Sequence, residues 1–256
     1  YQAGIAFNHA DPAKLDEIVL DGKFSRRCNG YSMSRTALQH DTYAFGLFKS
    51  LWKEVGGELK GGLGKTVVPA DATPALVWQS RPLGEVIRSI NKNSNNVMTR
   101  ELVYTLGAEI GGVPGTRAKG VEAIRSFLAS RGIDASSLVL QNGAGLSRDE
   151  RASPQLLADV LRAAEKSAYA PEFMASLSLG GLDGTTRGRF NRLGESLMHV
   201  KTGRLDHVSA LAGYVHAASG RTYVVVIVMN SEDAHRGPGQ EFESAVVRWV
   251  QAQPQP

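Results

Sequence analysis

The chain has 256 residues, of which 42% are hydrophobic and 21% charged, so it can bury a core as one large domain or two smaller ones. Its net charge of +4 comes from 29 basic and 25 acidic residues that are well mixed, and no basic run indicates a nucleic-acid partner. The one cysteine, Cys28, excludes an internal disulfide and a cysteine-based metal site, and no apolar run approaches the roughly 18 residues of a transmembrane segment.

Residues 1–75 are predicted to form a piece separate from the rest of the chain. The first 35 residues favour short extended segments and turns. A helix is predicted over Tyr43–Val55, where large apolar residues recur at helical spacing, and a short strand over Lys65–Pro69. Gly and Pro interrupt the stretch around this strand, which marks the boundary with residues 76–256. Because the chain has no initial Met and no charged-then-apolar leader, we expect it to begin within a longer protein or after processing.

The second part begins with helices and ends with strands. Helical spacing and helix-start signals predict helices from Pro82 to the residues before Ser94, and over Val97–Gly107, Thr116–Arg131 and Pro154–Ser167. Runs rich in β-branched residues then predict strands over Leu197–Thr202, His207–Ala217 and Arg221–Asn230.

The last predicted strand and the helix after it should form part of a core. Tyr223–Met229 is almost entirely apolar, which fits a strand buried on both faces. A closing amphipathic helix over Gly239–Val250 is expected to bury Phe242, Val246 and Trp249. Three antiparallel strands with a packing helix make half of an α/β sandwich and leave one side of the sheet unaccounted for.

Lys201-Thr202-Gly203 follows an apolar lead-in that predicts a strand. At that position a Lys offers a fixed cation, a Thr offers a hydroxyl, and a Gly lets an extended peptide lie against the strand edge. Such an edge would dock a peptide that ends in a carboxylate as an added strand. Taken alone, a strand-end Lys beside a turn is the simpler interpretation, because three-residue patterns occur by chance.

Ser94-Asn95-Asn96, taken alone, is typical of a turn or a helix cap. It precedes Lys201-Thr202-Gly203 by 107 positions, and this order and separation change the interpretation. Three further segments accompany the two tripeptides: Gln141–Arg148, Gly181–Thr185 and Ala210–Tyr214. Together these motifs resemble the class C penicillin-binding proteins, a family of D-alanyl-D-alanine carboxypeptidases and endopeptidases.

The resemblance implies an α/β fold of the serine β-lactamase and transpeptidase type, with an antiparallel sheet flanked by helices and incomplete at its N-terminal side. It implies a serine D-Ala-D-Ala carboxypeptidase or endopeptidase that acts on peptidoglycan stem peptides through an acyl-enzyme, with β-lactam antibiotics as acylating mimics. Residence in the periplasm follows from that substrate. No metal or organic cofactor is implied, and the six histidines show no paired ligand spacing.

The resemblance also implies roles for single residues. Ser94 would relay a proton to the leaving amine of D-alanine, and Asn96 would hydrogen-bond the catalytic Lys and the substrate carbonyl. Lys201 would help to fix the terminal carboxylate, with Thr202 and Gly203 in contact with the substrate. The backbone N–H of Arg204 would contribute to the oxyanion hole.

The nucleophile is the element that the sequence does not provide. Acyl transfer of this type needs a Ser activated by a Lys one helical turn later, and only Ser50-x-x-Lys53 and Ser89-x-x-Lys92 have that spacing. The first lies among large apolar residues, and the second is too close to Ser94 along one helix for the two hydroxyls to converge. We expect neither to be a nucleophile, so this chain alone is predicted to be inactive.

Three explanations for the missing nucleophile stay open. The chain is a C-terminal portion of a larger enzyme, or the molecule has upstream residues that the printed sequence lacks, or it is a pseudoenzyme. Under the first two explanations, residues 1–75 are expected to be a remnant of an inserted accessory domain. Residues 76–256 are then expected to be the C-terminal part of the penicillin-binding domain.

Two other functions also stay open. The chain could be a non-catalytic peptidoglycan-binding module, or a β-lactamase that needs a carboxylate on a cleft loop to activate water. Glu150 and Asp183 are the candidate carboxylates, although the family context disfavours both. The segment Asp183-Gly184-Thr185 is expected to shape a loop beside the cleft with no chemical role, and Gly143 and Gly145 are interpreted as turn residues.

Overall fold

A computed structural model describes residues 4–9, 18–23, 39–190 and 197–254. The chain divides into two compact units, Tyr1–Val77 and Trp78–Pro256, each described below by itself. Cys28, on which the disulfide argument rests, lies outside the described residues. Among the helices that are described, none combines the length and the apolar content needed to cross a bilayer.

The described residues of the first unit form one hairpin and one helix. Strand β1 (Gly4–His9) pairs antiparallel with β2 (Ile18–Lys23), and helix α1 spans His40–Glu54, close to the predicted range. No residue of α1 is buried. The strand predicted over Lys65–Pro69 is wrong. The backbone there is irregular and its two valines are exposed, because no neighbouring strand of the described residues supplies the hydrogen-bonding ladder that a strand needs.

Three helices of the second unit begin where the sequence provides a side-chain cap. The side chains of Asn95, Thr116 and Ser153 each accept a hydrogen bond from a backbone N–H in the first turn of the helix that follows. The helices are α2 (Leu83–Asn93), α3 (Asn96–Gly111), α4 (Arg117–Ser130), α5 (Pro154–Glu165), α6 (Ala170–Ser176) and α7 (Pro238–Gln251). Two short 3₁₀ turns, η1 (Gly184–Thr186) and η2 (Ala234–Arg236), complete them. The four predicted helices correspond to α2 to α5, whereas α6, too short for a clear period, was not predicted.

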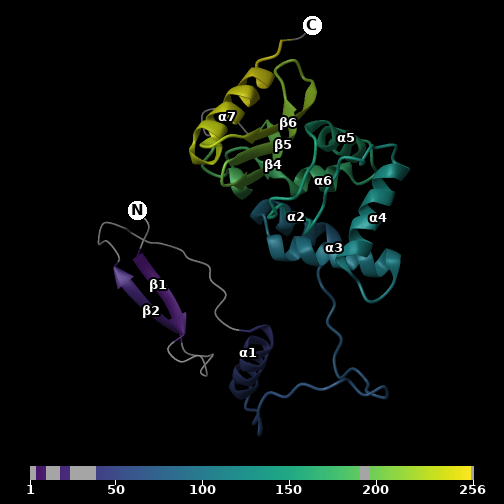
Figure 1. The fold of residues 1–256 in the computed structure, drawn as a ribbon, viewed down its shortest axis with the longest axis vertical. Helices are drawn as coiled ribbons and strands as arrows, with labels where there is room; N and C mark the ends of the chain where they lie inside the picture. Colours follow the sequence, from purple (N-terminus) through teal and green to yellow (C-terminus); the bar gives the residue numbers. More distant parts are fainter. Residues whose placement is uncertain (1–3, 10–17, 24–38, 191–196, 255–256) are drawn as a thin grey trace. The chain divides into compact units, whose positions relative to one another are not determined.

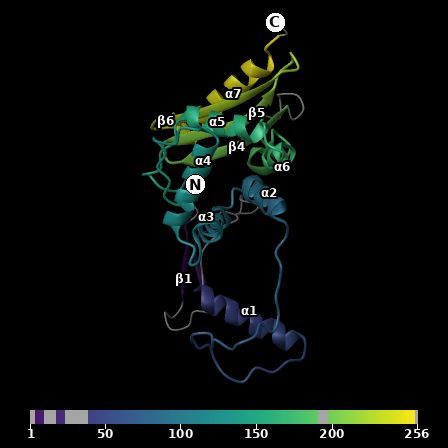
Figure 2. The same ribbon diagram turned by 90° about the vertical axis from the view of Figure 1, so that its right-hand side faces the viewer.

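A four-stranded antiparallel sheet forms the centre of this unit. Its strands stand in the order β3 (Ser178–Leu179), β4 (Met198–Leu205), β5 (Val208–His216) and β6 (Thr222–Asn230). Helix α7 packs on one face of the sheet and α5 and α6 pack on the other (Figure 1; Figure 2). The predicted sheet flanked by helices is therefore confirmed, as are its three long strands.

Strand β6 is buried on both faces over most of its length. Val225 and Ile227 join the core beneath α7, and Val224 and Val226 pack in the core beneath α5 and α6. Val228, near the end of the strand, is 38% exposed. The apolar run of β6 thus has the double burial that its sequence predicts, except at that end.

The predicted buried face of α7 is wrong. Phe242 and Trp249 are 53% and 66% exposed, and the residues that pack on the sheet are Val247 and Val250 instead. Only Val246 of the predicted set packs, in part, against the core. The helix is rotated by one residue from the orientation that its aromatic residues favour.

A buried carboxylate explains this rotation. Glu243 lies on the buried stripe of α7 and is fully inaccessible to solvent. Its Oε2 accepts a hydrogen bond of 2.7 Å from the guanidinium of Arg189, and its Oε1 accepts one of 2.6 Å from the hydroxyl of Ser209 on β5. These two hydrogen bonds offset the cost of burying the charge of Glu243. Glu243 can therefore face the sheet, although glutamate is usually a surface residue.

Gly213 allows β5 to lie close against β4. It stands opposite Val200 in the ladder, and a Cβ at this position would collide with the carbonyl oxygen of His199 and come within 2.8 Å of the Val200 Cα. These are backbone atoms of the strand that carries Lys201, so they cannot move aside without shifting that strand.

We expect Gly213→Ala to destabilise the second unit by about 1–3 kcal/mol, because overpacking against backbone forces the strands apart. Urea unfolding followed by circular dichroism measures the effect. Gly84→Ala is the matched control, since Gly84 lies in α2 where a Cβ would meet no non-neighbouring atom within 4 Å, and alanine there should be neutral or stabilising. Equal stability of the two variants would contradict the close packing of β4 and β5.

Candidate active site

A cleft of about 650 Å³ lies between the end of α2, the start of α3, the loop before α5 and strand β4. All six residues singled out from the sequence line it: Ser94, Asn96, Lys201, Thr202, Gly203 and Arg204. The structure therefore brings together two tripeptides that stand far apart in the chain.

Ser94 projects into the cleft from a strained backbone. It ends α2 in the left-handed region, with φ 51° and ψ 49°, which non-glycine residues rarely adopt. The next residue, Asn95, caps α3 by accepting the Met98 N–H at 3.0 Å, and Asn96 is the first residue of α3. A sharp turn between two helices thus places both Ser94 and Asn96 on the cleft wall.

Lys201 approaches from the opposite wall. Its Nζ donates hydrogen bonds to the hydroxyl oxygen of Ser94 at 3.0 Å and to the carbonyl oxygen of Thr202 at 2.7 Å. Burial lowers the pKa of the Lys201 amine below its ordinary value of 10.5. The contact joins a cation to a hydroxyl, the pair needed to move a proton in the cleft.

The remaining residues of the second tripeptide lie further along β4. The hydroxyl of Thr202 donates to the hydroxyl of Thr185 at 2.7 Å, and Gly203 and Arg204 are exposed at the cleft mouth. Strand β3 pairs only with His199 and Val200. Among the described residues, the outer edge of β4 from Lys201 onward has no strand partner, and it borders the cleft.

The loop before α5 forms another side of the cleft. Gly143 and Gly145 both have a φ near 70° and line the cleft, which fits their interpretation as turn residues. Glu150 supports this loop, because its Oε1 accepts the backbone N–H groups of Gln141 and Asn142 at 3.2 and 2.9 Å.

The other lining residues were not predicted from the sequence as site residues: Ile90, Asn91, Thr99, Gly143, Ala144, Gly145, Leu146, Leu157 and Thr185. Thr185 belongs to a segment that the sequence singled out but to which no chemistry was assigned.

Neither candidate Ser-x-x-Lys pair is arranged as a nucleophile and its base. Lys92 is engaged in an ion pair with Asp183 at 2.7 Å rather than with Ser89, and Ser89 does not line the cleft. Ser50 and Lys53 are exposed residues of α1 in the first unit.

A family profile described as the D-Ala-D-Ala carboxypeptidase 3 (S13) family matches residues 8–253. The chain belongs to this family. Members that it resembles include the D-alanyl-D-alanine carboxypeptidase of an Actinomadura species, 30% identical over 236 residues, which are 89% of this chain and 43% of that protein. The D-alanyl-D-alanine carboxypeptidase DacB of Haemophilus influenzae is 26% identical over 87% of this chain and 49% of its own length. The chain thus spans about half the length of the curated members that it matches.

Solved structures support the fold of this S13 family chain. Penicillin-binding protein 4 of Haemophilus influenzae superposes with a TM-score of 0.78 at 23% identity, covering 97% of this chain and 56% of that one. A predatory endopeptidase of Bdellovibrio bacteriovorus superposes with a TM-score of 0.58 at 18% identity, over 86% of this chain and 60% of its own. At these identities the likeness establishes the fold class predicted from the motifs.

The strain at Ser94 gives a stability test that is independent of activity. Ser94→Gly and Ser94→Ala both remove the hydroxyl, so the lost contact with Lys201 cancels when the two variants are compared. Because glycine adopts the left-handed region freely, we expect Ser94→Gly to be more stable than Ser94→Ala by about 1 kcal/mol. Thermal unfolding measures the difference, and an Ala variant as stable as the Gly variant would contradict the left-handed turn.

The lowered pKa of Lys201 gives a pH test. Between the folded-state pKa and the ordinary value of 10.5 the unfolded chain binds more protons, so the free energy of unfolding rises with pH in that window. We expect the stability of the wild type, relative to Lys201→Met, to increase as the pH rises toward 10.5. Urea unfolding at several pH values measures it, with Lys166→Met, which removes an exposed lysine, as the control. A difference that does not change with pH would contradict the burial of Lys201.

Proposed function

We propose that this chain provides one part of the active site of a serine D-Ala-D-Ala carboxypeptidase or endopeptidase. The observation that carries the proposal is the hydrogen bond between Lys201 and Ser94 inside the cleft of a chain that belongs to the S13 family. Because the chain covers about half of its relatives, the activity, the substrate and the periplasmic location of the whole protein are parts of this proposal.

Within the described parts of the chain, the edge of β4 beyond Val200 has no strand partner, and this edge suggests how the substrate binds. An extended stem peptide would lie along the edge from Lys201 to Leu205 as an additional strand, with main-chain hydrogen bonds to β4. The ammonium of Lys201 and the guanidinium of Arg204 would attract the C-terminal carboxylate of the peptide. The absence of a side chain at Gly203 leaves room for the peptide backbone.

The reaction is acyl transfer to a serine that we place outside the described cleft residues. Its Oγ would form a bond to the carbonyl carbon of the penultimate D-alanine, the C–N bond to the last D-alanine would break, and the serine proton would pass to the departing amine. We assign the relay of this proton to Ser94, and the hydrogen bond that its hydroxyl accepts from the Lys201 ammonium supports the assignment. Water would then hydrolyse the ester, releasing the shortened peptide and restoring the serine hydroxyl.

Asn96 and Arg204 would hold the reacting groups. Both line the cleft, Asn96 from the first turn of α3 and Arg204 from the exposed part of β4. We assign to the Asn96 amide the task of orienting the substrate carbonyl and the catalytic lysine. The backbone N–H of Arg204 is assigned to the oxyanion hole, which stabilises charge that develops on the carbonyl oxygen.

The β-lactamase alternative is less well supported. It needs a carboxylate that is free to activate water, and the two candidates have other contacts. Glu150 accepts two backbone N–H groups of its own loop, and Asp183 pairs with Lys92. A non-catalytic peptidoglycan-binding module remains the other alternative, and it differs from the enzyme only in the absence of a nucleophile.

Acylation by benzylpenicillin tests the proposal directly. We expect the intact mass of the printed 27.5 kDa chain to stay unchanged after incubation with benzylpenicillin, because Ser50 is an exposed residue of α1 and Ser89 lies outside the active-site cleft, with Lys92 paired to Asp183. A longer form of the protein that includes the nucleophile should gain the mass of one penicillin per molecule, and Ser94→Ala in that form should slow the gain.

Each other result would change the assignment. An adduct on the 27.5 kDa chain itself would overturn the placement of the nucleophile outside it, and peptide mapping would then identify the serine. A full-length protein that binds peptidoglycan peptides but never gains the adduct would favour the binding module.

A further inference from the structure

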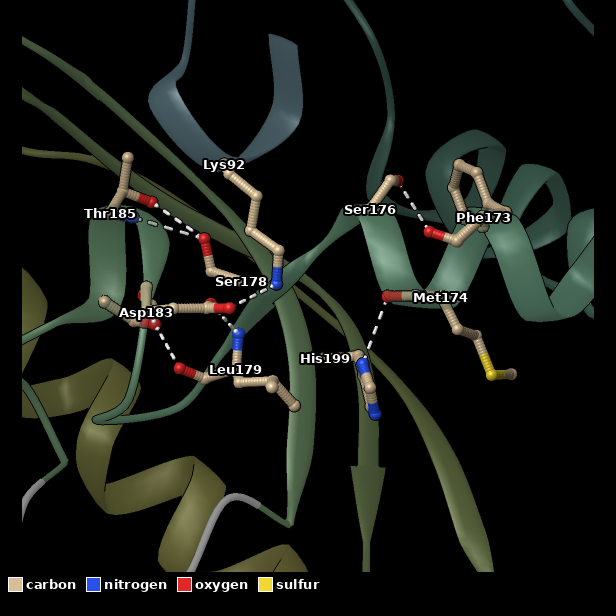
Figure 3. A network of polar contacts seen from close by, with 10 residues as sticks. Lys92, Phe173, Met174, Ser176, Ser178, Leu179, Asp183, Thr185 and His199 are labelled. Carbon is tan, nitrogen blue, oxygen red and sulfur yellow. Dashed lines mark hydrogen bonds and ion pairs between the residues drawn. The ribbon is translucent and has the colours of Figure 1, made fainter. Parts of the chain in front are cut away.

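An ion pair ties the two walls of the cleft together behind the residues that line it. Nζ of Lys92, near the end of α2, lies 2.7 Å from Oδ2 of Asp183, the residue that precedes η1 (Figure 3). The two side chains are only 12% and 29% exposed, so water screens their attraction much less than in a surface pair. Lys92 stands two residues before Ser94, and Asp183 two residues before Thr185.

Asp183 also organises the turn on which Thr185 lies. Its Oδ1 accepts the backbone N–H of Leu179 at 2.8 Å, which closes the loop that leads from β3 into η1 (Figure 3). The backbone N–H of Thr185 donates to the hydroxyl of Ser178 at 3.2 Å. Burial by itself would raise the pKa of Asp183, but hydrogen bonds from Lys92 and Leu179 and the charge of Lys92 lower it below 3.8, so the carboxylate is charged at neutral pH.

The turn packs directly on the end of α2. A Cβ on Gly184 would collide with the hydroxyl of Ser178 and come within 3.1 Å of the carbonyl oxygen of Lys92. The backbone of η1 and the backbone of α2 are therefore in contact just behind Ser94. A shift of one would be transmitted to the other.

The turn that contains η1 contacts the cleft through the hydroxyl of Thr185. Thr185 lines the cleft, and its Oγ1 accepts the hydrogen bond of Thr202 at 2.7 Å. Thr202 is adjacent to Lys201, whose ammonium bonds both Ser94 and the Thr202 carbonyl oxygen. Three side-chain contacts therefore connect these segments in a ring: Lys92 with Asp183, Thr185 with Thr202, and Lys201 with Ser94. The backbone joins the members of neighbouring contacts.

We propose that Lys92 and Asp183 are positioning residues, which hold the Ser94 turn and the Thr185 hydroxyl in register across the cleft and so fix the place of Lys201. The assignment rests on these contacts alone, whereas its consequence for catalysis rests on the proposed function. Asp183-Gly184-Thr185 then has a defined task in place of the purely structural one expected from the sequence.

Breaking the pair at Lys92 tests the proposal, because Asp183 keeps its bond to Leu179 in that variant. In Lys92→Met we expect the pKa of Lys201, measured by NMR of its labelled side chain, to rise toward 10.5 as water enters the cleft. The methyl signals of Thr185 and Thr202 should shift. Lys92→Arg, which keeps the cation, should restore values close to those of the wild type.

Two controls separate positioning from general destabilisation. Arg162→Met breaks the ion pair between Arg162 and Asp159 on α5, whose side chains are 60% and 35% exposed. This variant should leave the pKa of Lys201 and the methyl signals of both threonines unchanged. If Lys92→Met does not fold, Lys92→Met with Asp183→Asn removes the pair without leaving an unpaired charge. A folded variant in either form with the wild-type Lys201 pKa and threonine signals overturns the proposal.

The catalytic consequence is measured separately, on a form of the protein that benzylpenicillin acylates. There Lys92→Met should slow acylation about tenfold to a hundredfold, since small displacements of reacting groups cost rate on that scale. Lys92→Arg should be close to the wild type. Shifted NMR signals without acylation of any wild-type form would support the positioning role and count against the proposed function. Unchanged NMR signals would overturn the positioning role whatever the acylation rate.

Discussion

The register of β4 against β5 is the constraint on which the cleft depends. Met198 and Val200 are almost completely buried beneath α7, so the pleat directs His199 and Lys201 to the opposite face, toward α2 and α6. A slip of one residue would bury the ammonium of Lys201 under α7 and expose two core residues. The hydrophobic core therefore selects the register, and the register aims the cation at Ser94. Gly213 contributes to this constraint because its lack of a side chain permits the two strands to lie close at that point.

Much of this arrangement could be predicted from the sequence, because it depends on local patterns. The three long strands and helices α2 to α5 follow from apolar periodicity, caps and turn residues, and the two tripeptides indicate the cleft. The strand predicted over Lys65–Pro69 shows the limit of that approach. An apolar run becomes a strand only when a partner strand lies beside it, and a sequence does not show whether one will.

The other differences arise from pairs of residues far apart in the chain. The orientation of α7 depends on Glu243 meeting Arg189 and Ser209, and the role of Asp183 depends on meeting Lys92. A charged residue considered by itself in the sequence is predicted to lie on the surface, because burying a charge without a partner is costly. Which charges will be paired is a property of the tertiary fold, and for that reason neither pair could be predicted. The same holds for Thr185, whose hydroxyl acquires its partner only when η1 and β4 come together.

The separation of Ser94 and Lys201 along the chain has a consequence for folding. The helical pair α3–α4 and the β4–β5–β6 meander form from neighbouring segments, whereas the contact across the cleft joins residues 107 positions apart. Closing so long a loop is entropically costly, and it is rewarded only after the helices and the sheet have docked. A partly folded chain would accordingly have most of its helices and strands but no cleft. A small molecule that fits the cleft would bind the native state alone, and it would draw the folding equilibrium toward that state.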